Sequence, residues 1–407
     1  MKLSKIKNFD SKIRKSKGSY SNLLKISNAI KLKNGNIKIV GGAVRDLILD
    51  QENSKEVDLA TDIEPKDVIY CLEKKKIQYI KLGIKFGCIT AKINNELIEI
   101  TSLRKDIKSD GRWPDIKFTK SWLEDSMRRD FTINAIYVDQ NGLIYDPQNG
   151  IKDLLNKKVL FIGDPCKRIK EDYLRILRFL RFSFVYSGKI DIKSLKICVK
   201  YKERIKTLSF ERRLKEISKM IILKNFEKNF FTLKKHGFFH EIFETKIYFR
   251  NATEMFSIER KLDMISSIRR MKYLFQMRKP NFLKVFSKKD LKRINTFLKI
   301  KEYDKDHFQE IIYLKGKELL IDQLIFDASK KKISFHKLKS LVSFIKSYKI
   351  PIFPIDGNDI KSLGISRGEN VGYLKKKTES WWIGKNFFPT KADCLDYLNS
   401  LPASKRR

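Results

Sequence analysis

The chain has 407 residues, 42% of them apolar, and its 88 Lys and Arg against 48 Asp and Glu give a formal net charge of +40. This length and composition predict a globular protein of two or three domains. No apolar run approaches the ~18 residues of a transmembrane helix, so we expect no membrane span. The five cysteines are scattered and never form a CxxC pair. That pattern argues against a disulfide framework or a zinc site and for a reducing compartment, the cytoplasm.

The charge excess predicts a polyanionic partner, most simply nucleic acid, because neutralising phosphates releases their counterions. The alternative explanation is a lysine-rich composition without a binding role, since Lys and Ile are frequent throughout the chain. The first 22 residues are rich in lysine but lack the apolar core of a secretory signal. We expect a basic arm that touches RNA there, with an organellar transit peptide as the alternative.

The first sixty residues show alternating helix and strand signals. Apolar residues at helical spacing over residues 23–30 predict a helix before a short buried strand at Ile37–Val40. Two glycines follow the strand, and a second helix is predicted from about Val44. The run Glu56–Ala60 is predicted to be the second strand.

A helix and a hairpin are predicted next. Pro65 suits a first helical turn, so we expect a helix that runs to Lys75. Two β-prone runs, Ile84–Ile93 and Glu96–Ser102, flank the pair Asn94-Asn95. Asparagine tolerates the positive φ that tight hairpin turns need, so these runs predict a β-hairpin.

Beyond the hairpin the signals change from strand to helix. Residues 106–120 are charged and contain Gly and Pro, which predicts an exposed loop, and Arg128–Tyr137 is predicted as helical. After about residue 165 strand signals nearly vanish, and apolar residues recur every three or four positions as far as residue 350. A change of composition at Ile350–Pro354 indicates a linker to a C-terminal module. The sequence therefore predicts an α/β N-terminal domain followed by an all-helical remainder.

The run from Gly41 to Asp46 has the composition of a phosphate-binding turn. Consecutive glycines allow the backbone to approach a phosphate closely, and the N-terminus of the following helix offers free N–H groups. Arg45 lies where its guanidinium can bind a phosphate in a bidentate manner.

Three carboxylates are candidates for a metal site. Glu56 and Asp58 are two positions apart on a predicted strand, so both project from the same face and can hold a divalent cation together. Glu99, on the later hairpin strand, can supply a third carboxylate. Two-metal phosphoryl or nucleotidyl transfer requires such a set beside a phosphate site. The alternative is a solvent-facing acidic pair next to a structural Gly-Gly turn.

Two later runs carry further polar residues. Arg128–Ala135 combines two arginines, an aspartate and an asparagine, which suit contacts to phosphates and ribose hydroxyls. In the run Arg168–Arg178, Asp172 and Arg175 are predicted to lie at i and i+3 on one face of a helix, where an acceptor and a donor can read a base edge. The alternative for this pair is a surface ion pair that contributes little.

Together these runs resemble the class II tRNA nucleotidyltransferase and bacterial poly(A) polymerase family of the DNA polymerase β-like nucleotidyltransferase superfamily. The matching segments extend over roughly residues 20–220 and are Gly41–Asp46, Glu56–Thr61, Arg128–Ala135, Glu171–Phe179 and Ser209–Glu216. A weaker similarity to the tail of bacterial CCA-adding members covers Asp356–Ile360, Gly364-Ile365, Gly372–Leu374 and Trp381-Trp382.

The resemblance implies a fold and a division into parts. The fold is an α+β nucleotidyltransferase head, a small mixed sheet with helices, followed by an all-α neck, body and tail. The implied divisions are a basic arm at 1–22, the head at 23–150, the neck at 151–220, the body at 221–350 and a tRNA-contacting tail at 351–407.

The resemblance also implies roles for individual residues. The triphosphate-binding turn corresponds to Gly41, Gly42 and Arg45, and the metal carboxylates to Glu56 and Asp58. The sugar-reading motif corresponds to Arg129, Asp130 and Asn134, the template for the incoming base to Asp172 and Arg175, and a phosphate-contacting arginine to Arg178. The family has aspartate where this chain has Glu56. The added methylene can displace the ion by about an ångström, which is enough to cost on the order of 10²-fold in rate.

The implied activity is template-independent addition of CCA to tRNA 3′ ends from CTP and ATP, with pyrophosphate released and Mg²⁺ at a two-ion site. A poly(A) polymerase, a partial enzyme that adds only CC or only A, and a non-catalytic RNA-binding protein are the alternatives. The tail similarity favours tRNA, and the retained Asp58, Arg45 and Asp172 argue against loss of activity. We expect no membrane and no protein partner.

Two features have open interpretations. The loop at 106–120, with Trp113 at its tip, is either a flexible element for switching between CTP and ATP or a plain surface loop. Trp381 and Trp382 can stack on RNA, but tandem tryptophans on a helix more often pack into a core, and we expect the core position here.

Overall fold

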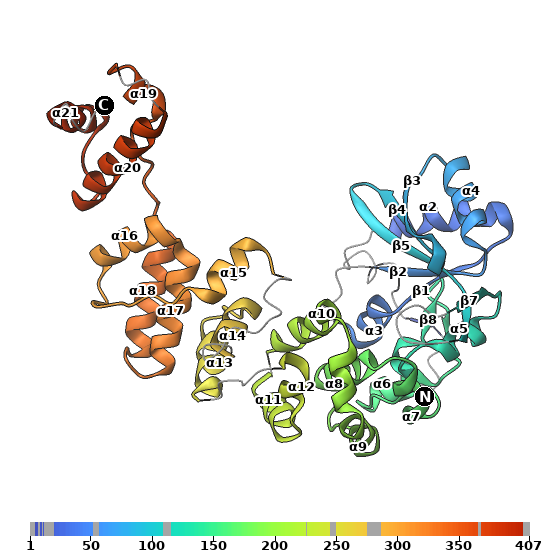
Figure 1. Ribbon diagram of the computed structural model, residues 1–407. Coiled ribbons are helices and arrows are strands. Elements are labelled where there is room, and N and C mark those ends of the chain that lie inside the picture. Colours follow the sequence, from blue (N-terminus) through green and yellow to red (C-terminus); the bar gives the residue numbers. More distant parts are fainter. Residues whose placement is uncertain are drawn as a thin grey trace. The chain divides into compact units, whose positions relative to one another are not determined.

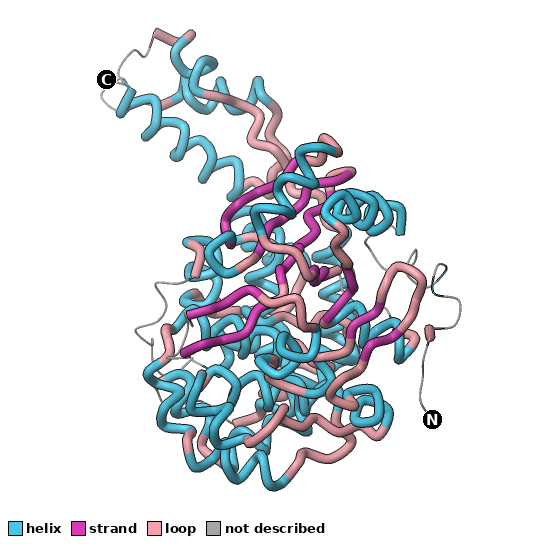
Figure 2. Tube along the Cα trace, turned by 90° about the vertical axis from the view of Figure 1, so that its right-hand side faces the viewer, coloured by secondary structure: helices cyan, strands magenta, loops and turns pink. Residues whose placement is uncertain are grey.

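The computed structural model describes residues 5–6, 9, 11, 20–51, 57–108, 115–224, 226–244, 250–274, 286–364 and 368–401 (Figure 1). The chain divides into two compact units, Met1–Glu244 and Thr245–Arg407, each described here by itself. The division falls inside the stretch expected as the body. Strands lie in the first unit, and after Tyr145 the named elements of the described chain are all helices (Figure 2). The predicted fold class, a mixed-sheet head followed by helices, is therefore confirmed.

The first unit is built on a seven-stranded mixed sheet with the strand order β3-β4-β5-β2-β1-β8-β9. Its strands are β1 (Ile37–Val40), β2 (Asp58–Thr61), β3 (Gln78–Gly83), β4 (Cys88–Ile93), β5 (Glu96–Ser102), β8 (Tyr137–Val138) and β9 (Ile144–Tyr145). The pairing of β2 with β5 is parallel, and the other pairings are antiparallel. A separate two-stranded sheet joins β6 (Arg104–Lys108) to β7 (Asp115–Phe118).

One face of this sheet is covered by helices. α4 (Pro65–Lys74) packs on β3 and β4, and α2 (Tyr20–Ile30) packs on α4. Alternate residues of β4 and β5, such as Ile89 and Ile100, are fully buried beneath these helices, whereas the residues between them are not buried. The sheet therefore has a covered apolar face and a second face on which polar side chains lie.

The predicted hairpin is present, with a different start. Asn94 and Asn95 both have positive φ, +50° and +62°, as the predicted turn requires. The first strand starts at Cys88 because Ile84–Phe86 form a 3-10 turn that ends at Gly87. The strand β3 was not predicted, since its residues are exposed on both faces and show no alternation of apolar and polar residues.

Two predictions in the next segment are wrong. Residues 106–108 and 115–118 belong to the paired strands β6 and β7, not to a loop, and Trp113 lies outside the described residues. The helix predicted over Arg128–Tyr137 ends at Arg128, because α5 covers Trp122–Arg128. The Asp130 carboxylate accepts hydrogen bonds from the Phe131 N–H and the Asn134 amide, and such local bonds compete with helical ones.

Of the remaining named helices of the first unit, α3 lies between β1 and β2 in the chain and the others follow β9. These helices are α3 (Gly42–Leu49), α6 (Gly150–Leu155), α7 (Pro165–Glu171), α8 (Leu174–Tyr186), α9 (Ile192–Lys200), α10 (Phe210–Ile221), α11 (Phe226–Lys235) and α12 (Phe238–Phe243). α8 packs along α10. Phe131 makes ring contacts with Phe161, Phe179 and Phe182, so this aromatic cluster joins the sheet-side segment to α8.

The second unit is helical in its described part. Its helices are α13 (Ala252–Lys261), α14 (Ser267–Leu274), α15 (Lys288–Asn295), α16 (Lys305–Lys315), α17 (Lys317–Ser329), α18 (Phe335–Ser347), α19 (Gly357–Lys361), α20 (Gly368–Gly384) and α21 (Lys391–Ser400). Trp382 is buried and Trp381 stacks on Tyr397 with ring centroids 4.3 Å apart, which confirms the predicted core position.

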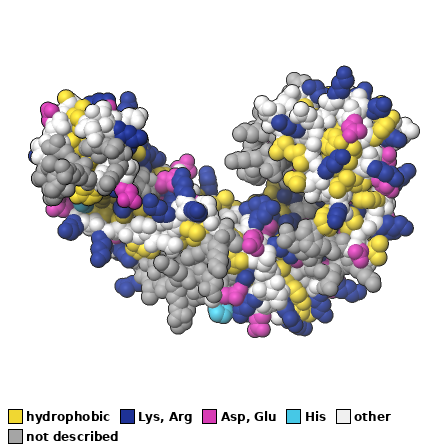
Figure 3. Space-filling model, turned by 45° about the horizontal axis from the view of Figure 1, so that its top comes forward, with side chains coloured by type: hydrophobic (Ala, Val, Ile, Leu, Met, Phe, Trp, Pro, Cys, Tyr) yellow, Lys and Arg dark blue, Asp and Glu magenta, His cyan; other side chains and the backbone are white. Residues whose placement is uncertain are grey.

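Two surface properties bear on function. On the face shown in Figure 3, Lys and Arg side chains are spread over the surface and do not gather in a single patch. Within the part of the chain that the structure describes, no helix combines the length and apolar character needed to cross a membrane.

Candidate active site

The Gly41-Gly42 turn lies against a carboxylate. β1 ends at Val40, and Gly41 then adopts φ +81°, a conformation that glycine reaches without steric cost. A Cβ atom at Gly41 would lie 3.4 Å from the Asp58 Oδ2 atom, so the turn and this carboxylate are immediate neighbours. The predicted order of strand, Gly-Gly turn and helix is present, with α3 starting at Gly42.

The parallel pairing of β2 with β5 brings two predicted carboxylates together. Asp58 is paired directly with Glu99, so both side chains leave the same face of adjacent strands, and both residues are exposed. Glu56, the remaining candidate, lies outside the described residues. No group of three metal-ligating side chains occurs among the residues that are described, a set that lacks Glu56. Two exposed carboxylates on neighbouring strands fit the oxygen ligands that Mg²⁺ prefers.

A buried chain of hydrogen bonds links the predicted nucleotide-binding residues. Arg45, only 6% exposed, donates from Nη1 to the Asn134 side-chain oxygen. The Asn134 amide donates to Asp130 Oδ1 at 2.7 Å, and Asp130 Oδ2 accepts from Arg178 Nε at 2.6 Å. The Arg45 guanidinium lies 5.1 Å from the Phe182 ring centroid, which holds it against α8. The structure thus joins residues from three separate sequence runs.

This chain of contacts continues into α10. Glu216, which is buried, pairs with Arg181 Nε at 2.6 Å and with Arg178 Nη1 at 3.7 Å. Burial alone would raise the pKa of Asp130, but the Arg178 guanidinium and the Asn134 amide outweigh it and lower the pKa to about 2. Asp130 is therefore a permanent anion that fixes Arg178 and Asn134 in place at neutral pH.

Arg129 lies in a second cluster. Its guanidinium donates to Asp125 Oδ2 from Nε at 3.1 Å and from Nη2 at 3.0 Å, and to the Tyr137 hydroxyl at 3.0 Å. Asp125, 1% exposed, also pairs with Arg128 Nη2 at 2.7 Å. Burial would raise the pKa of Asp125, but Arg129, Arg128 and the Tyr137 hydroxyl lower it to about 2. Arg129 Nη1 also donates to the Asn134 carbonyl at 3.3 Å, so this guanidinium joins Asp125 to the backbone of the Asp130–Asn134 segment.

The low pKa of Asp125 predicts an acid-dependent stability. Because the folded-state pKa lies below the ordinary value of about 3.9, its contribution is complete above that value and is lost as pH falls towards 2. For a shift of this size the contribution is about 2–3 kcal/mol. In urea unfolding, Asp125→Asn should therefore be less stable than the wild type at pH 7, and the difference should shrink between pH 4 and pH 3. A difference that stays constant over this range would contradict the assignment.

The prediction that one helix contains both Asp172 and Arg175 is wrong, because Asp172 lies between two helices. α7 ends at Glu171, and Asp172 is extended with φ −156° and ψ 109°. Its Oδ1 atom accepts from the Leu174 N–H at 3.0 Å, which stabilises the start of α8 and explains the interruption.

Asp172 and Arg175 are held by different neighbours. Asp172 Oδ2 pairs with Arg212 Nη2 of α10 at 2.8 Å. Arg175 Nη1 pairs with Glu171 and donates to the Arg168 carbonyl at 2.8 Å. Both side chains are partly exposed. They lie close to the Arg45–Arg178 chain of contacts, since the Arg175 charge helps to lower the pKa of Asp130 and the Asp172 charge helps to raise the pKa of Arg178.

Several residues of this network were missed by the sequence reasoning. They are Asp125, Glu171, Arg181, Arg212 and Glu216. Asp125 could have been found from the arginines three and four residues after it, Arg128 and Arg129. Arg212 and Glu216 lie in Ser209–Glu216, one of the runs that resemble the family. Their partners are more than thirty residues away, so no local spacing predicts them.

Comparison with known proteins finds a family profile and several relatives that are similar to this chain. A family profile described as "Poly A polymerase head domain" matches residues 37–160, from β1 to the segment after α6. The human "CCA tRNA nucleotidyltransferase 1, mitochondrial" is 29% identical over 397 residues, covering 90% of this chain and 87% of the human protein. The "CCA-adding enzyme" of Lactobacillus helveticus is 38% identical over 183 residues, covering 44% of this chain and 45% of that enzyme.

Solved structures show the same fold over nearly the whole chain. The CCA-adding enzyme of Bacillus stearothermophilus, solved in complex with CTP, superposes with a TM-score of 0.68 at 21% identity, covering 93% of this chain and 96% of that one. The Thermotoga maritima CCA-adding enzyme, complexed with tRNA, gives a TM-score of 0.53 at 18% identity, covering 96% and 98%. The head-domain match, the near-full-length human relative and these structures agree in their direction: the chain is similar to CCA-adding nucleotidyltransferases.

Proposed function

We propose that this protein adds CCA to the 3′ ends of tRNA, without a nucleic-acid template, from CTP and ATP. The observation that carries the proposal is the pairing of Asp58 with Glu99 directly beside the Gly41 turn. The name of the similar human protein supports tRNA as the acceptor, and the bacterial enzyme solved with CTP supports CTP as a substrate. A similar tRNA nucleotidyltransferase solved with a primer tRNA and an incoming ATP analog supports ATP. In this reaction the tRNA 3′-hydroxyl attacks the α-phosphorus, a P–O bond forms, and the bond to pyrophosphate breaks.

The residues around the turn are proposed to bind the triphosphate and the metal. Gly41 and Gly42 let the start of α3 approach the phosphates. The buried Arg45 is proposed to bind a phosphate, and its hydrogen bond to Asn134 fixes the direction of its guanidinium. Asp58 and Glu99, together with Glu56, would hold Mg²⁺. When bound, the Mg²⁺ ions would stabilise the charge that develops on the attacking and leaving oxygens.

The α7–α8 segment is proposed to select the base. The Asp172 carboxylate and the Arg175 guanidinium offer an acceptor and a donor, and Arg212 and Glu171 limit the positions that they can adopt. Asp130 and Asn134 are proposed to contact the ribose, and Arg178 a phosphate. Because Arg129 is bound to Asp125 and also donates to the Asn134 carbonyl, its proposed contribution to the sugar-reading motif is to hold the Asn134 backbone in place.

The compartment and the alternatives belong to the same proposal. All five cysteines are free thiols, which supports a reducing compartment, and we propose the cytoplasm. A poly(A) polymerase or a partial CC- or A-adding enzyme would share the head residues. These readings differ in which nucleotides are incorporated and how many.

The proposal predicts a defined pattern of incorporation. Purified protein is incubated with Mg²⁺, one labelled nucleotide and a tRNA that lacks all of CCA, ends after the first C or ends after CC. CTP should extend the first two substrates and stop at CC, whereas ATP should extend the third by one residue. An indefinite A tail would show a poly(A) polymerase, and incorporation of one nucleotide type alone would show a partial enzyme. Binding of tRNA without incorporation would show a non-catalytic protein and would contradict the proposal.

A further inference from the structure

The sheet face that carries Asp58 and Glu99 continues beyond the candidate active site onto β4 and β3. On β1 and β2 this face is packed beneath α5, where Trp122 covers Val40 and Ala60. On β4 and β5 the same face carries exposed side chains, among them Lys92 and Leu97, and Leu97 is 58% exposed. The face therefore continues from the paired carboxylates towards the edge strand β3.

The strand register connects that edge directly to the carboxylates. Glu99 is paired with Asp58 on one side and with Thr90 on the other, and Thr90 is paired with Ile80. These four residues form one row across β2, β5, β4 and β3. With neighbouring strands about 4.8 Å apart, the row is ~14 Å long. A chain bound at Asp58 can thus reach β3 along one continuous surface.

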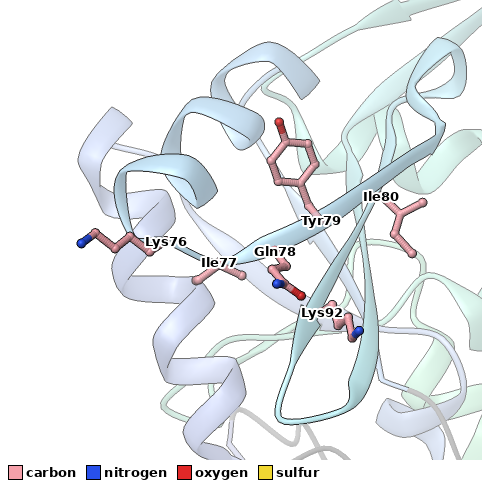
Figure 4. Close-up of a pocket in the computed structure, with 6 residues that line it drawn as sticks. All are labelled: Lys76, Ile77, Gln78, Tyr79, Ile80 and Lys92. Carbon is pink, nitrogen blue, oxygen red and sulfur yellow. The ribbon is translucent and has the colours of Figure 1, made fainter.

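A pocket lies at the β3 end of this surface. It has a volume of about 500 Å³ and is lined by Lys76, Ile77, Gln78, Tyr79, Ile80 and Lys92 (Figure 4). Lys92 is paired with Gln78, and Figure 4 shows their side chains next to each other, with Tyr79 on the other side of β3.

The charges of this region favour an anionic ligand. Lys76 and Lys92 are exposed, and neither forms an ion pair within the described part of the chain. Of the β3, β4 and β5 side chains on this face, Glu99 alone is acidic, and it belongs to the candidate metal site. Ile80 and Leu97, 38% and 58% exposed, add apolar surface between the lysines and Glu99. Lysines interleaved with exposed apolar side chains suit an RNA strand, whose phosphates and sugar or base faces need both.

We propose that the RNA strand leading to the reacting 3′ end lies across this face, with backbone phosphates bound by Lys92 and Lys76. This inference rests on the proposed function, because it takes the Asp58–Glu99 pair as the place where the 3′-hydroxyl reacts. Ile80 and Leu97 contact the sugars or bases between the bound phosphates and the 3′ end. The edge strand β3 therefore serves as an RNA-binding subsite that holds the primer strand a few nucleotides behind its terminus.

Charge removal at the two lysines tests the subsite. The double variant Lys76→Gln/Lys92→Gln removes both charges and keeps long side chains. Residue 76 has φ +54°, and glutamine adopts this backbone conformation no less readily than lysine. The binding of a labelled tRNA lacking CCA is measured by fluorescence anisotropy at several salt concentrations. Loss of two phosphate contacts should make the negative slope of log K against log salt shallower, by about 1.4 for a single strand and about 1.8 for a duplex. We expect affinity to fall about tenfold in low salt, with CTP binding unchanged.

The matched control is Lys25→Gln/Lys31→Gln, which removes two exposed charges near the covered side of the sheet. It should keep the wild-type slope, and Lys76→Arg/Lys92→Arg should restore the wild-type behaviour. Equal slopes for the test and control variants would overturn the subsite.

Single neutral linkages locate the contact. A methylphosphonate is placed in turn at each of the last phosphates of the tRNA primer. One or more of these changes should weaken binding to the wild type and have no further effect on Lys76→Gln/Lys92→Gln. Equal effects on both proteins at every position would overturn the inference. These are binding measurements, so they are independent of incorporation; a wild type that binds but never extends tRNA would contradict the proposed function alone.

Discussion

Asp58→Asn is expected to reduce nucleotide incorporation by about 10³-fold or more while leaving tRNA affinity within about twofold. Asp58 is paired with Glu99 and borders the Gly41 turn, so its carboxylate is the described group best placed to hold a divalent ion at the triphosphate. Such an ion contributes several kcal/mol to transition-state stabilisation, and each 1.36 kcal/mol is a factor of ten in rate. The measurement is single-turnover incorporation of labelled CTP at saturating tRNA.

The control for this prediction is Asp67→Asn on α4. Asp67 is partly exposed, and its pairing with Lys33 at 3.7 Å is a surface contact of little energy. Its incorporation rate should equal that of the wild type. Since Asp58 is exposed, Asp58→Asn should also unfold at the wild-type urea concentration. A variant that keeps both its fold and full incorporation would remove Asp58 from the metal site.

Asp130→Asn is expected to lower the free energy of unfolding of the first unit by about 2–3 kcal/mol and to impair incorporation. Both oxygens of Asp130 accept hydrogen bonds, one from Arg178 and the other from Asn134 and the Phe131 N–H. An asparagine amide would turn one of these contacts into two facing donors. Breaking a fully buried ion pair costs 3–5 kcal/mol, and the value here is lower because the Arg178 side chain is 32% exposed.

Urea unfolding at pH 7 measures the loss of stability, with Asp139→Asn as the control. Asp139 accepts from two backbone N–H groups in an exposed turn, so its replacement should change stability much less. We also expect Asp130→Asn to raise the KM for CTP, because Asn134 and Arg178 lose the anion that orders them. Wild-type stability together with wild-type kinetics would show that this chain of contacts is not needed.

Local patterns in the sequence predicted much of the first unit. Pro65 marks the start of α4, and the Asn94-Asn95 turn joins β4 to β5, because a residue's own backbone preferences decide these features. The sequence also predicted that Glu99 can share a face with Asp58, whereas their direct pairing across β2 and β5 is seen only in the structure. Where local chemistry and the fold agree, sequence reasoning was enough.

Other features depend on contacts between distant residues. The strand β3 is exposed on both faces, so it has no apolar alternation, and it is a strand only because β4 pairs with it. The Asp130–Arg178 and Arg181–Glu216 pairs join residues 48 and 35 positions apart. The backbone at Asp172 is extended, and its side chain accepts the hydrogen bond that stabilises the start of α8. The apolar spacing is helical across both α7 and α8, so it does not reveal this break. These features require the fold itself.

At the candidate metal site the chain departs from the family pattern at Glu56, where the family has aspartate. Single-turnover incorporation of labelled CTP by a Glu56→Asp variant measures the effect of this difference on the rate.

The most direct measurement of the proposed activity is sequencing of tRNA 3′ ends after incubation of a tRNA lacking CCA with the wild type, CTP, ATP and Mg²⁺. We predict that the products end in CCA and are extended no further, and that Asp58→Asn leaves the ends unchanged. Unextended ends with the wild type, or ends that continue as poly(A), would contradict the assignment of this chain as a CCA-adding enzyme.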